Sequence, residues 1–142
     1  MKRIIVATDG SSGANRALDL AVRMAKTGGC ELTILTIGGS IPGAELRRLA
    51  AVDGDLSQTL TENANQILER ARKRAHRLGM PSVKLQVEWG DPAEVIIDTA
   101  RREKADILVV GRRGRGRLSA MLLGSVSQKL ASLAPCAVLV VP

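Results

Sequence analysis

Five short aliphatic runs, separated by segments with helical periodicity, restrict this chain to few folds. Such buried strands, alternating with helices, form parallel sheets through right-handed crossovers that place helices on both faces. The sequence therefore predicts an α/β fold: an open five-stranded parallel sheet with four helices on its two faces, in one domain over residues 1–142. The runs are KRIIVATDG (2–10), CELTILTIGG (30–39), VKLQVEWG (83–90), ADILVVG (105–111) and CAVLVVP (136–142).

Three of the four helices are predicted from apolar residues at helical spacing over 12–28, 59–79 and 92–105, and the fourth follows the glycine-rich stretch after residue 111. We expect the first to begin at the N-cap Ser12 and to stop at Gly28. Asp91 is the expected N-cap of the third helix, with Pro92 at its first position. The segment 40–58 is interpreted as a loop with one helical turn at AELRRLAAV.

The amino-acid composition limits which classes of function are possible for this protein. There is no Phe or Tyr and a single Trp89, so the core must be aliphatic and base-stacking platforms are nearly absent. The net charge of +7 attracts polyanions and keeps nucleic acid among the candidate partners. No apolar run approaches a signal peptide or the ~18 residues of a membrane span, so we expect a cytoplasmic protein with reduced Cys30 and Cys136. His76, among basic residues, is expected on a solvated helix face.

The stretch GRRGRGRLSAMLLGSVSQ (111–128) has the residue types of a phosphate-binding loop. Glycines allow backbone N–H groups to turn toward an anion, and a helix N-terminus adds partial positive charge. The hydroxyls of Ser125 and Ser127 are further candidate donors. Neither a Walker P-loop nor a GxGxxG dinucleotide motif is present. On spacing alone, a surface turn with solvated arginines, in which Ser125 is an ordinary N-cap, explains the stretch equally well.

The combination Gly111-x2-Gly114-x9-Gly124-Ser125, lying between ADILVVG and CAVLVVP, resembles the ATP-binding signature of the universal stress protein family. The opening IIVATDGS, the segment GDPAEVI and the length agree with it over the whole chain. The resemblance implies a sheet of order 3-2-1-4-5, adenine-nucleotide binding and a homodimer that acts in stress physiology.

Carried over position by position, the resemblance implies a nucleotide site with three parts. The end of the first strand faces the nucleotide, with Asp9 near the ribose or a magnesium ion, and Ile37 lies by the adenine. The ribose and phosphates are surrounded by residues of the glycine-rich stretch. The implied residues are Ala7, Thr8, Asp9, Ile37, Gly111, Arg113, Gly114, Gly124, Ser125, Val126 and Ser127.

Two of these residues can also be explained by a structural role without a ligand, and the arginines of the loop depart from the family pattern. Asp9 also suits a turn ahead of Ser12, and Ile37 also suits the core. Arg112, Arg113, Arg115 and Arg117 make the loop unusually basic, whether as phosphate clamps or as the border of a pocket.

We expect an ATP-binding regulatory module with little or no turnover and no catalytic residue. A slow ATPase or phosphotransferase is the alternative, although no His or Glu beside the glycines offers a base. A nucleic-acid-binding protein is the third alternative, because the sequence contains no recognised nucleic-acid-binding motif. The run Cys136 to Val141 would leave unpaired backbone groups at a sheet edge, and a homodimer through this strand would cover them.

Overall fold

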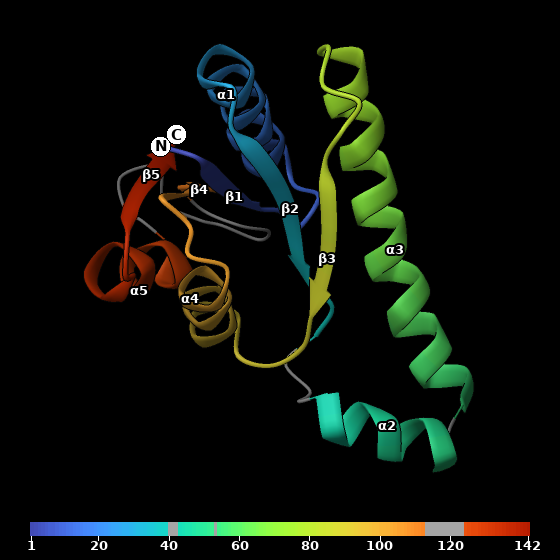
Figure 1. The fold of residues 1–142 in the computed structure, drawn as a ribbon. Helices are drawn as coiled ribbons and strands as arrows, with labels where there is room; N and C mark the ends of the chain where they lie inside the picture. The colour runs from blue at the N-terminus through green and yellow to red at the C-terminus, as the bar shows by residue number, and fades with distance from the viewer. Residues whose placement is uncertain (40–42, 53, 113–123) are drawn as a thin grey trace.

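Five parallel strands form one sheet, in the order β3-β2-β1-β4-β5, in the computed structural model (Figure 1). The structure describes residues 1–39, 43–52, 54–112 and 124–142. The predicted fold class and strand order are confirmed. The strands are β1 (Arg3–Ala7), β2 (Glu31–Ile37), β3 (Lys84–Glu88), β4 (Ile107–Gly111) and β5 (Ala137–Val141).

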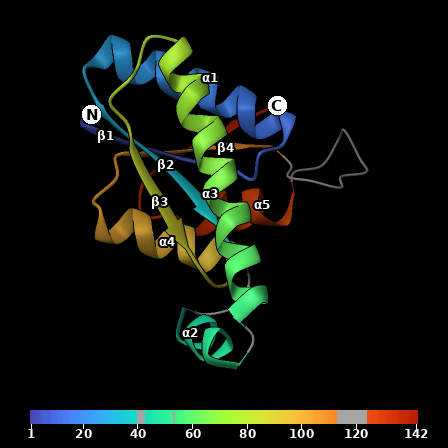
Figure 2. The ribbon, with the colours of Figure 1, turned by 90° about the vertical axis from the view of Figure 1, so that its right-hand side faces the viewer.

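Helices cover both faces of the sheet. They are α1 (Ser12–Gly28), α2 (Gly43–Val52), α3 (Gly54–Arg77), α4 (Pro92–Arg102) and α5 (Ser125–Leu133). Figure 2 shows α1 on one side of the strands and α4 and α5 on the other. All the crossovers of a parallel sheet run the same way, so the helices begin near the carboxyl ends of the strands and end near the amino ends.

Alternation along the strands divides the aliphatic core into two layers. Ile4 and Val6 of β1 face α1 and α3, where they pack with Leu18, Val22 and Leu68. Ile5 of β1 points to the other face. There it joins a second cluster whose members, from β2 and β4 and from α4 and α5, include Leu35, Ile96, Leu108, Val110 and Leu130.

The segment 40–58 differs from its interpretation as a loop with one helical turn. Residues 43–52 form the ten-residue helix α2, and α3 begins at Gly54 rather than near Thr59. Glu45, Arg47 and Arg48 are exposed, and α2 packs chiefly against α3. Figure 1 shows α2 and the first part of α3 beyond the ends of β2 and β3. The exposed polar residues of α2 and its packing against α3 give this segment a weaker periodic signal than that of the helices that cover the sheet.

Two helix boundaries of α1 shift by one residue from their predicted positions. Ser11, not Ser12, is the N-cap, because its extended backbone lets Oγ accept a hydrogen bond from the amide of Ala14 at 3.2 Å. At the other end the C-cap is Gly29, left-handed with φ of 64°, one residue after the predicted stop at Gly28. Asp91 caps α4 as predicted, accepting from the amide of Glu94.

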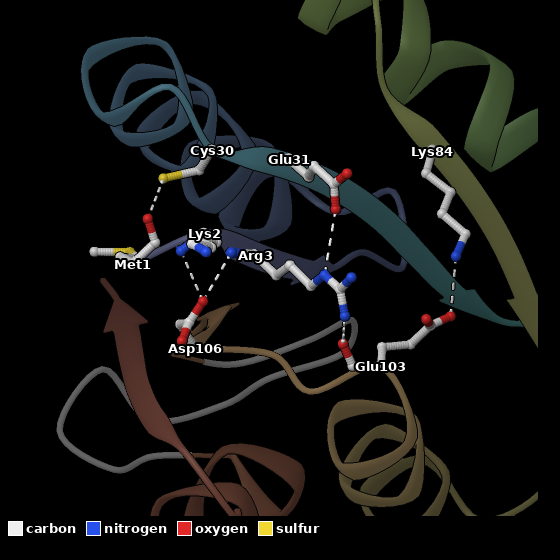
Figure 3. A network of polar contacts seen from close by, with 8 residues as sticks. All are labelled: Met1, Lys2, Arg3, Cys30, Glu31, Lys84, Glu103 and Asp106. Carbon is white, nitrogen blue, oxygen red and sulfur yellow. Dashed lines mark hydrogen bonds and ion pairs between the residues drawn. The ribbon is translucent and has the colours of Figure 1, made fainter.

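A polar network joins the amino ends of the strands (Figure 3). Asp106 Oδ2 accepts hydrogen bonds from the backbone amides of Lys2 and Arg3, at 2.7 and 2.8 Å, and links the start of β1 to β4. These two hydrogen bonds hold the pKa of the Asp106 carboxyl below its usual value. Arg3 continues the network to Glu31 on β2 through an ion pair of 3.3 Å.

Neither cysteine forms a disulfide: Cys30 is buried and Cys136 is half-buried. Burial raises the pKa of the Cys136 thiol. His76 is exposed on α3, as expected. Within the described residues, no group of three or more His, Cys, Asp or Glu side chains is placed to hold a metal ion. None of the helices found there is long and apolar enough to span a bilayer.

Candidate nucleotide site

The strand order reverses between β1 and β4, and in sheets of this type ligands bind at the carboxyl edge beside that reversal. β1 ends at this edge with Ala7, followed by the buried Thr8. The amide of Thr8 donates to the carbonyl of Leu35 at 2.9 Å, and Thr36 Oγ1 donates to the carbonyl of Thr8 at 2.7 Å. Both bonds run to β2 and fix the point at which the chain leaves the sheet.

Asp9 begins a tight turn that leads into α1. Its Oδ1 accepts a hydrogen bond from the amide of Ser11 at 2.9 Å, and the amide of Gly10 donates to Thr8 Oγ1 at 3.1 Å. Gly10 has φ of 81°, a conformation that favours glycine. The carboxylate of Asp9 is therefore held at the edge by its own turn. Asp9 can hold this turn and also contact a ribose or a magnesium ion, since a carboxylate accepts several hydrogen bonds.

The two loops of the carboxyl edge touch through glycines. A β-carbon at Gly111, the last residue of β4, would lie 3.0 Å from the carbonyl carbon of Gly13 and 3.3 Å from the amide nitrogen of Ala14. A side chain at position 111 would press on the backbone in the first turn of α1, which would have to shift to admit it. The first glycine of the signature thus has a packing role that does not depend on a ligand.

The glycine-rich loop leaves and rejoins the sheet at a single point. The amide of Arg112 donates to the carbonyl of Val141 at 2.7 Å, and the amide of Gly124 donates to the carbonyl of Arg112 at 2.9 Å. The loop between these two residues therefore starts and ends beside β5. Arg113, Gly114, Arg115 and Arg117, on which part of the site prediction depends, lie outside the described residues.

The N-terminus of α5 has no side-chain cap. Its N-cap is Gly124, with an extended backbone at φ −67° and ψ 161°, whereas α1 begins at a serine cap and α4 at an aspartate cap. Glycine offers no side-chain oxygen to the first amides of the helix, so no N-cap side chain compensates their partial positive charge. Ser125 is thus the first residue of α5 and not its N-cap. An anion is the natural partner of such a helix end.

The two serines of α5 differ in what they offer a ligand. Ser127 is 4% exposed, and its hydroxyl donates to the carbonyl of Gly111 at 2.8 Å. Its one proton therefore holds α5 against the end of β4. Ser125 is exposed. Val126 lies between them and packs against the second core cluster.

Arg112 contributes a feature that the sequence pattern does not reveal. Its Nε is buried and has no hydrogen-bond partner within the part of the chain that the structure describes. A buried N–H group without an acceptor is costly, and the cost is larger for a charged group. Arg112 follows Gly111 directly, at the point where Gly124 returns to the sheet. This unsatisfied donor is the second observation, beside the open end of α5, that favours an anion at this edge.

The end of β2 forms the other side of the edge. Ile37 is half-buried and packs against the second core cluster. Next to it, the ring of Trp89 covers Gly38, where a β-carbon would lie 2.5 to 2.8 Å from three ring atoms. The only aromatic side chain of the protein therefore packs at the carboxyl edge. The sequence signals for this contact are Trp89, just before GDP, and the glycine pair 38–39 after β2. Neither was included in the site predicted from the sequence.

Comparison with known proteins gives one consistent result. The model of the Universal stress protein family matches residues 1–142. Universal stress protein Rv1636 of Mycobacterium tuberculosis is 34% identical over 142 residues, covering 99% of this chain and 95% of that protein.

Two solved structures have the same fold. Universal stress protein UspA from Lactobacillus plantarum superposes with a TM-score of 0.83, over 99% of this chain and 97% of that one, at 24% identity. A universal stress protein solved in complex with cAMP superposes with a TM-score of 0.78. It is 32% identical, and the match covers 99% of this chain and 97% of that chain.

Proposed function

This chain belongs to the universal stress protein family, and we propose that it is a regulatory module that binds an adenine nucleotide, ATP in the first place. The observation that carries the proposal is the N-terminus of α5, which has no side-chain cap, beside the Nε of Arg112, which is buried and has no partner among the described residues. Both call for an anion at the carboxyl edge, as a nucleotide phosphate would supply. The relative solved with cAMP supports an adenine nucleotide as the ligand.

In this proposal each group of residues at the carboxyl edge of the sheet has a distinct role. The phosphates lie at the amides of Gly124, Ser125 and Val126, with Arg113 and Gly114 completing the loop around them. Gly111 and Ser127 hold β4, α1 and α5 together beneath the nucleotide. Ala7 and Thr8 line its ribose side, and Ile37 lies by the adenine.

Asp9 fits a magnesium ion only as one of several ligands. Mg²⁺ in nucleotide sites keeps several waters and takes one or two carboxylates together with phosphate oxygens. Asp9 stands at the carboxyl edge, and the described residues hold no larger acidic group. We therefore propose that Asp9 binds Mg²⁺ together with the nucleotide, directly or through water, and that the ion supplies charge neutralisation for the phosphates.

We propose binding without appreciable turnover. Phosphoryl transfer to water needs a group that positions the attacking water. In this proposal Asp9, the carboxylate that follows β1, binds the magnesium ion rather than an attacking water, and its turn holds it through the amide of Ser11. We further propose that the protein is cytoplasmic, that residues 1–142 act as one domain, and that two copies pair through β5, the strand at one edge of the sheet.

The decisive experiment combines a melting curve with a turnover assay. A ligand that binds only the folded protein stabilises it by RT ln(1 + [L]/Kd), about 2.7 kcal/mol at one hundred times Kd. Mg-ATP should raise Tm in proportion to the logarithm of its concentration, whereas inorganic phosphate at the same ionic strength should not. Mass spectrometry of nucleotide released by denaturation would identify the natural ligand.

Two outcomes would overturn the proposal. If Tm did not respond to ATP, AMP or cAMP at millimolar concentration, nucleotide binding would be rejected. Turnover on the order of 1 per second or faster would reject the binding module and favour the ATPase or phosphotransferase.

A further inference from the structure

Five basic side chains line the junction between α1 and α3, and we call them the cationic seam: Arg23, Lys26, Arg70, Arg74 and Arg77. Positions 19, 23 and 26 follow one stripe of α1, and positions 70, 74 and 77 follow one stripe of α3. The two helices contact each other and run in the same direction. Asp19 is the one acidic residue on these two stripes.

The two stripes meet through Asp19. Both carboxylate oxygens of Asp19 accept hydrogen bonds from Arg74, from Nε at 2.6 Å and from a terminal nitrogen at 2.8 Å. The hydrogen bonds from Arg74, together with the positive charges of Arg74 and Arg23, lower the pKa of the Asp19 carboxyl. At the end of α1, Lys26 Nζ donates to the carbonyl of Leu78 at 2.9 Å. These contacts place the stripes beside each other and leave the seam with a surplus of four positive charges.

Three cations of the seam are not held by a direct contact in the described part of the protein. Arg23, Arg70 and Arg77 are exposed, and none makes a hydrogen bond or ion pair with another described residue. Basic residues in the last turn of a helix are stabilised by the helix dipole, which accounts for Lys26, Arg74 and Arg77. Arg23 and Arg70 lie before the last turns of their helices, so the dipole does not account for them.

We propose that the cationic seam binds the phosphodiester backbone of a nucleic acid without reading its sequence. Four of its five cations are arginines, whose planar guanidinium groups match phosphate oxygens in pairs. From Arg70 to Arg77 the stripe is about 10 Å long at 1.5 Å per residue. About 10 Å of duplex carries roughly six negative charges, which is close to the number of cations on the seam.

The surroundings of the seam favour nucleic acid over a membrane. A polybasic patch alone holds a protein weakly at a bilayer, and stable attachment needs an added apolar or lipid anchor. Among the large apolar side chains exposed in the described residues, Leu78 is the one that adjoins a seam residue in the sequence. The single aromatic residue, Trp89, packs at the opposite edge of the sheet. Contact would therefore be limited to phosphates, so a duplex should bind more tightly than a single strand of equal length.

The seam is separate from the proposed nucleotide site. α1 begins at the carboxyl edge with its cap Ser11, while Arg23 and Lys26 lie in the second half of this helix. The seam therefore extends toward the amino edge, where β2 and β3 begin. Nucleotide binding at the carboxyl edge and polyanion binding at the seam can succeed or fail independently of each other.

The test compares two triple variants with equal net charge. One carries Arg23→Gln, Arg70→Gln and Arg77→Gln on the seam. The other carries Arg101→Gln, Lys104→Gln and Lys129→Gln, which remove three exposed cations around α4 and α5 on the other face of the sheet. Both are compared with the parent by fluorescence anisotropy on a 20-base-pair duplex and a 20-nucleotide single strand, between 50 and 200 mM salt, after a melting curve has shown that each is folded.

The seam variant should bind the duplex at least tenfold more weakly at 50 mM salt. Its slope of log K against log salt should become shallower by about 2.7, at roughly 0.9 per lost phosphate contact. The control variant should follow the parent.

Three results would overturn the proposal. Equal losses in both triple variants would mean that only the net charge attracts the DNA. Parent-like binding by the seam variant, with the loss found instead when Arg112, Arg113, Arg115 and Arg117 are changed to Gln, would move the interaction to the glycine-rich loop. Binding of the parent to phosphatidylserine vesicles without binding to DNA would identify a membrane surface.

Discussion

Gly111 at the end of β4 lies directly against the backbone of Gly13 in the first turn of α1, where a β-carbon would stand 3.0 Å from the carbonyl carbon of Gly13. This contact joins the two loops of the carboxyl edge, one from each side of the strand reversal. The geometry of the proposed nucleotide site therefore depends on a glycine that itself faces protein backbone.

Replacing Gly111 by alanine should lower the free energy of unfolding by about 1–3 kcal/mol, the usual cost of overpacking a tight contact. The obstacle is backbone, which moves less readily than a side-chain end. Gly54→Ala is the control, because nothing lies within 4 Å of a β-carbon there. Urea denaturation measures both. Equal stability of the two variants would show that α1 shifts freely and that the contact does not constrain the edge.

Replacing Gly124 by valine should abolish ATP binding and leave the fold intact. The backbone at Gly124, with φ −67° and ψ 161°, is open to any residue, but the added side chain stands at the N-terminus of α5. Calorimetric titration with Mg-ATP measures the loss, and a melting curve without ligand checks the fold.

The matched variant changes Arg112, Arg113, Arg115 and Arg117 to Gln. It should weaken ATP only partly, because the amides at the start of α5 remain. If folded Gly124→Val kept full ATP affinity while the arginine variant lost it, the loop would be an electrostatic patch and not a phosphate site.

Replacing Val140 by proline should convert a β5-paired dimer into monomer. The carbonyl of Val141 faces β4, since it accepts from Arg112, so the backbone groups of Val140 point outward by alternation. Proline removes the outward donor and is tolerated at a sheet edge. Val140→Thr keeps the amide and should remain dimeric. Light scattering at micromolar concentration reports both; a parent that is itself monomeric contradicts the proposed dimer.

Replacing Asp106 by asparagine should destabilise the protein in a pH-dependent manner. The folded carboxyl has a pKa below its usual value, because the ionised form accepts the amides of Lys2 and Arg3. A lowered folded pKa means that this stabilisation is fully present above the unfolded pKa and disappears as pH falls through the folded pKa. The difference in Tm between parent and variant should be constant from pH 5 to 7 and shrink below pH 4. A difference that did not change with pH would assign the effect to packing.

Much of the fold was predictable because its signals are local. Each strand is a continuous aliphatic run, and α1 and α4 carry an apolar stripe and a polar cap near the positions where these were expected. α2 was not predictable in this way. Its Glu45, Arg47 and Arg48 are exposed, and it is supported by α3 rather than by the sheet. A helix that packs chiefly against another helix lacks the regular stripe by which helices that cover a sheet are recognised.

The α/β class, the aliphatic core and the placement of glycines and serines at the carboxyl edge could be predicted from residue type and spacing along the chain. Which of those residues face protein was decided only by the tertiary structure. Ser127 donates its proton to the carbonyl of Gly111, and Arg112 buries a donor that has no partner in the described part of the chain. The seam arises in the same way: Asp19 and Arg74 stand 55 positions apart and meet only because parallel crossovers place α1 beside α3. Contacts of this kind depend on packing between distant elements, for which the linear sequence holds no spacing rule.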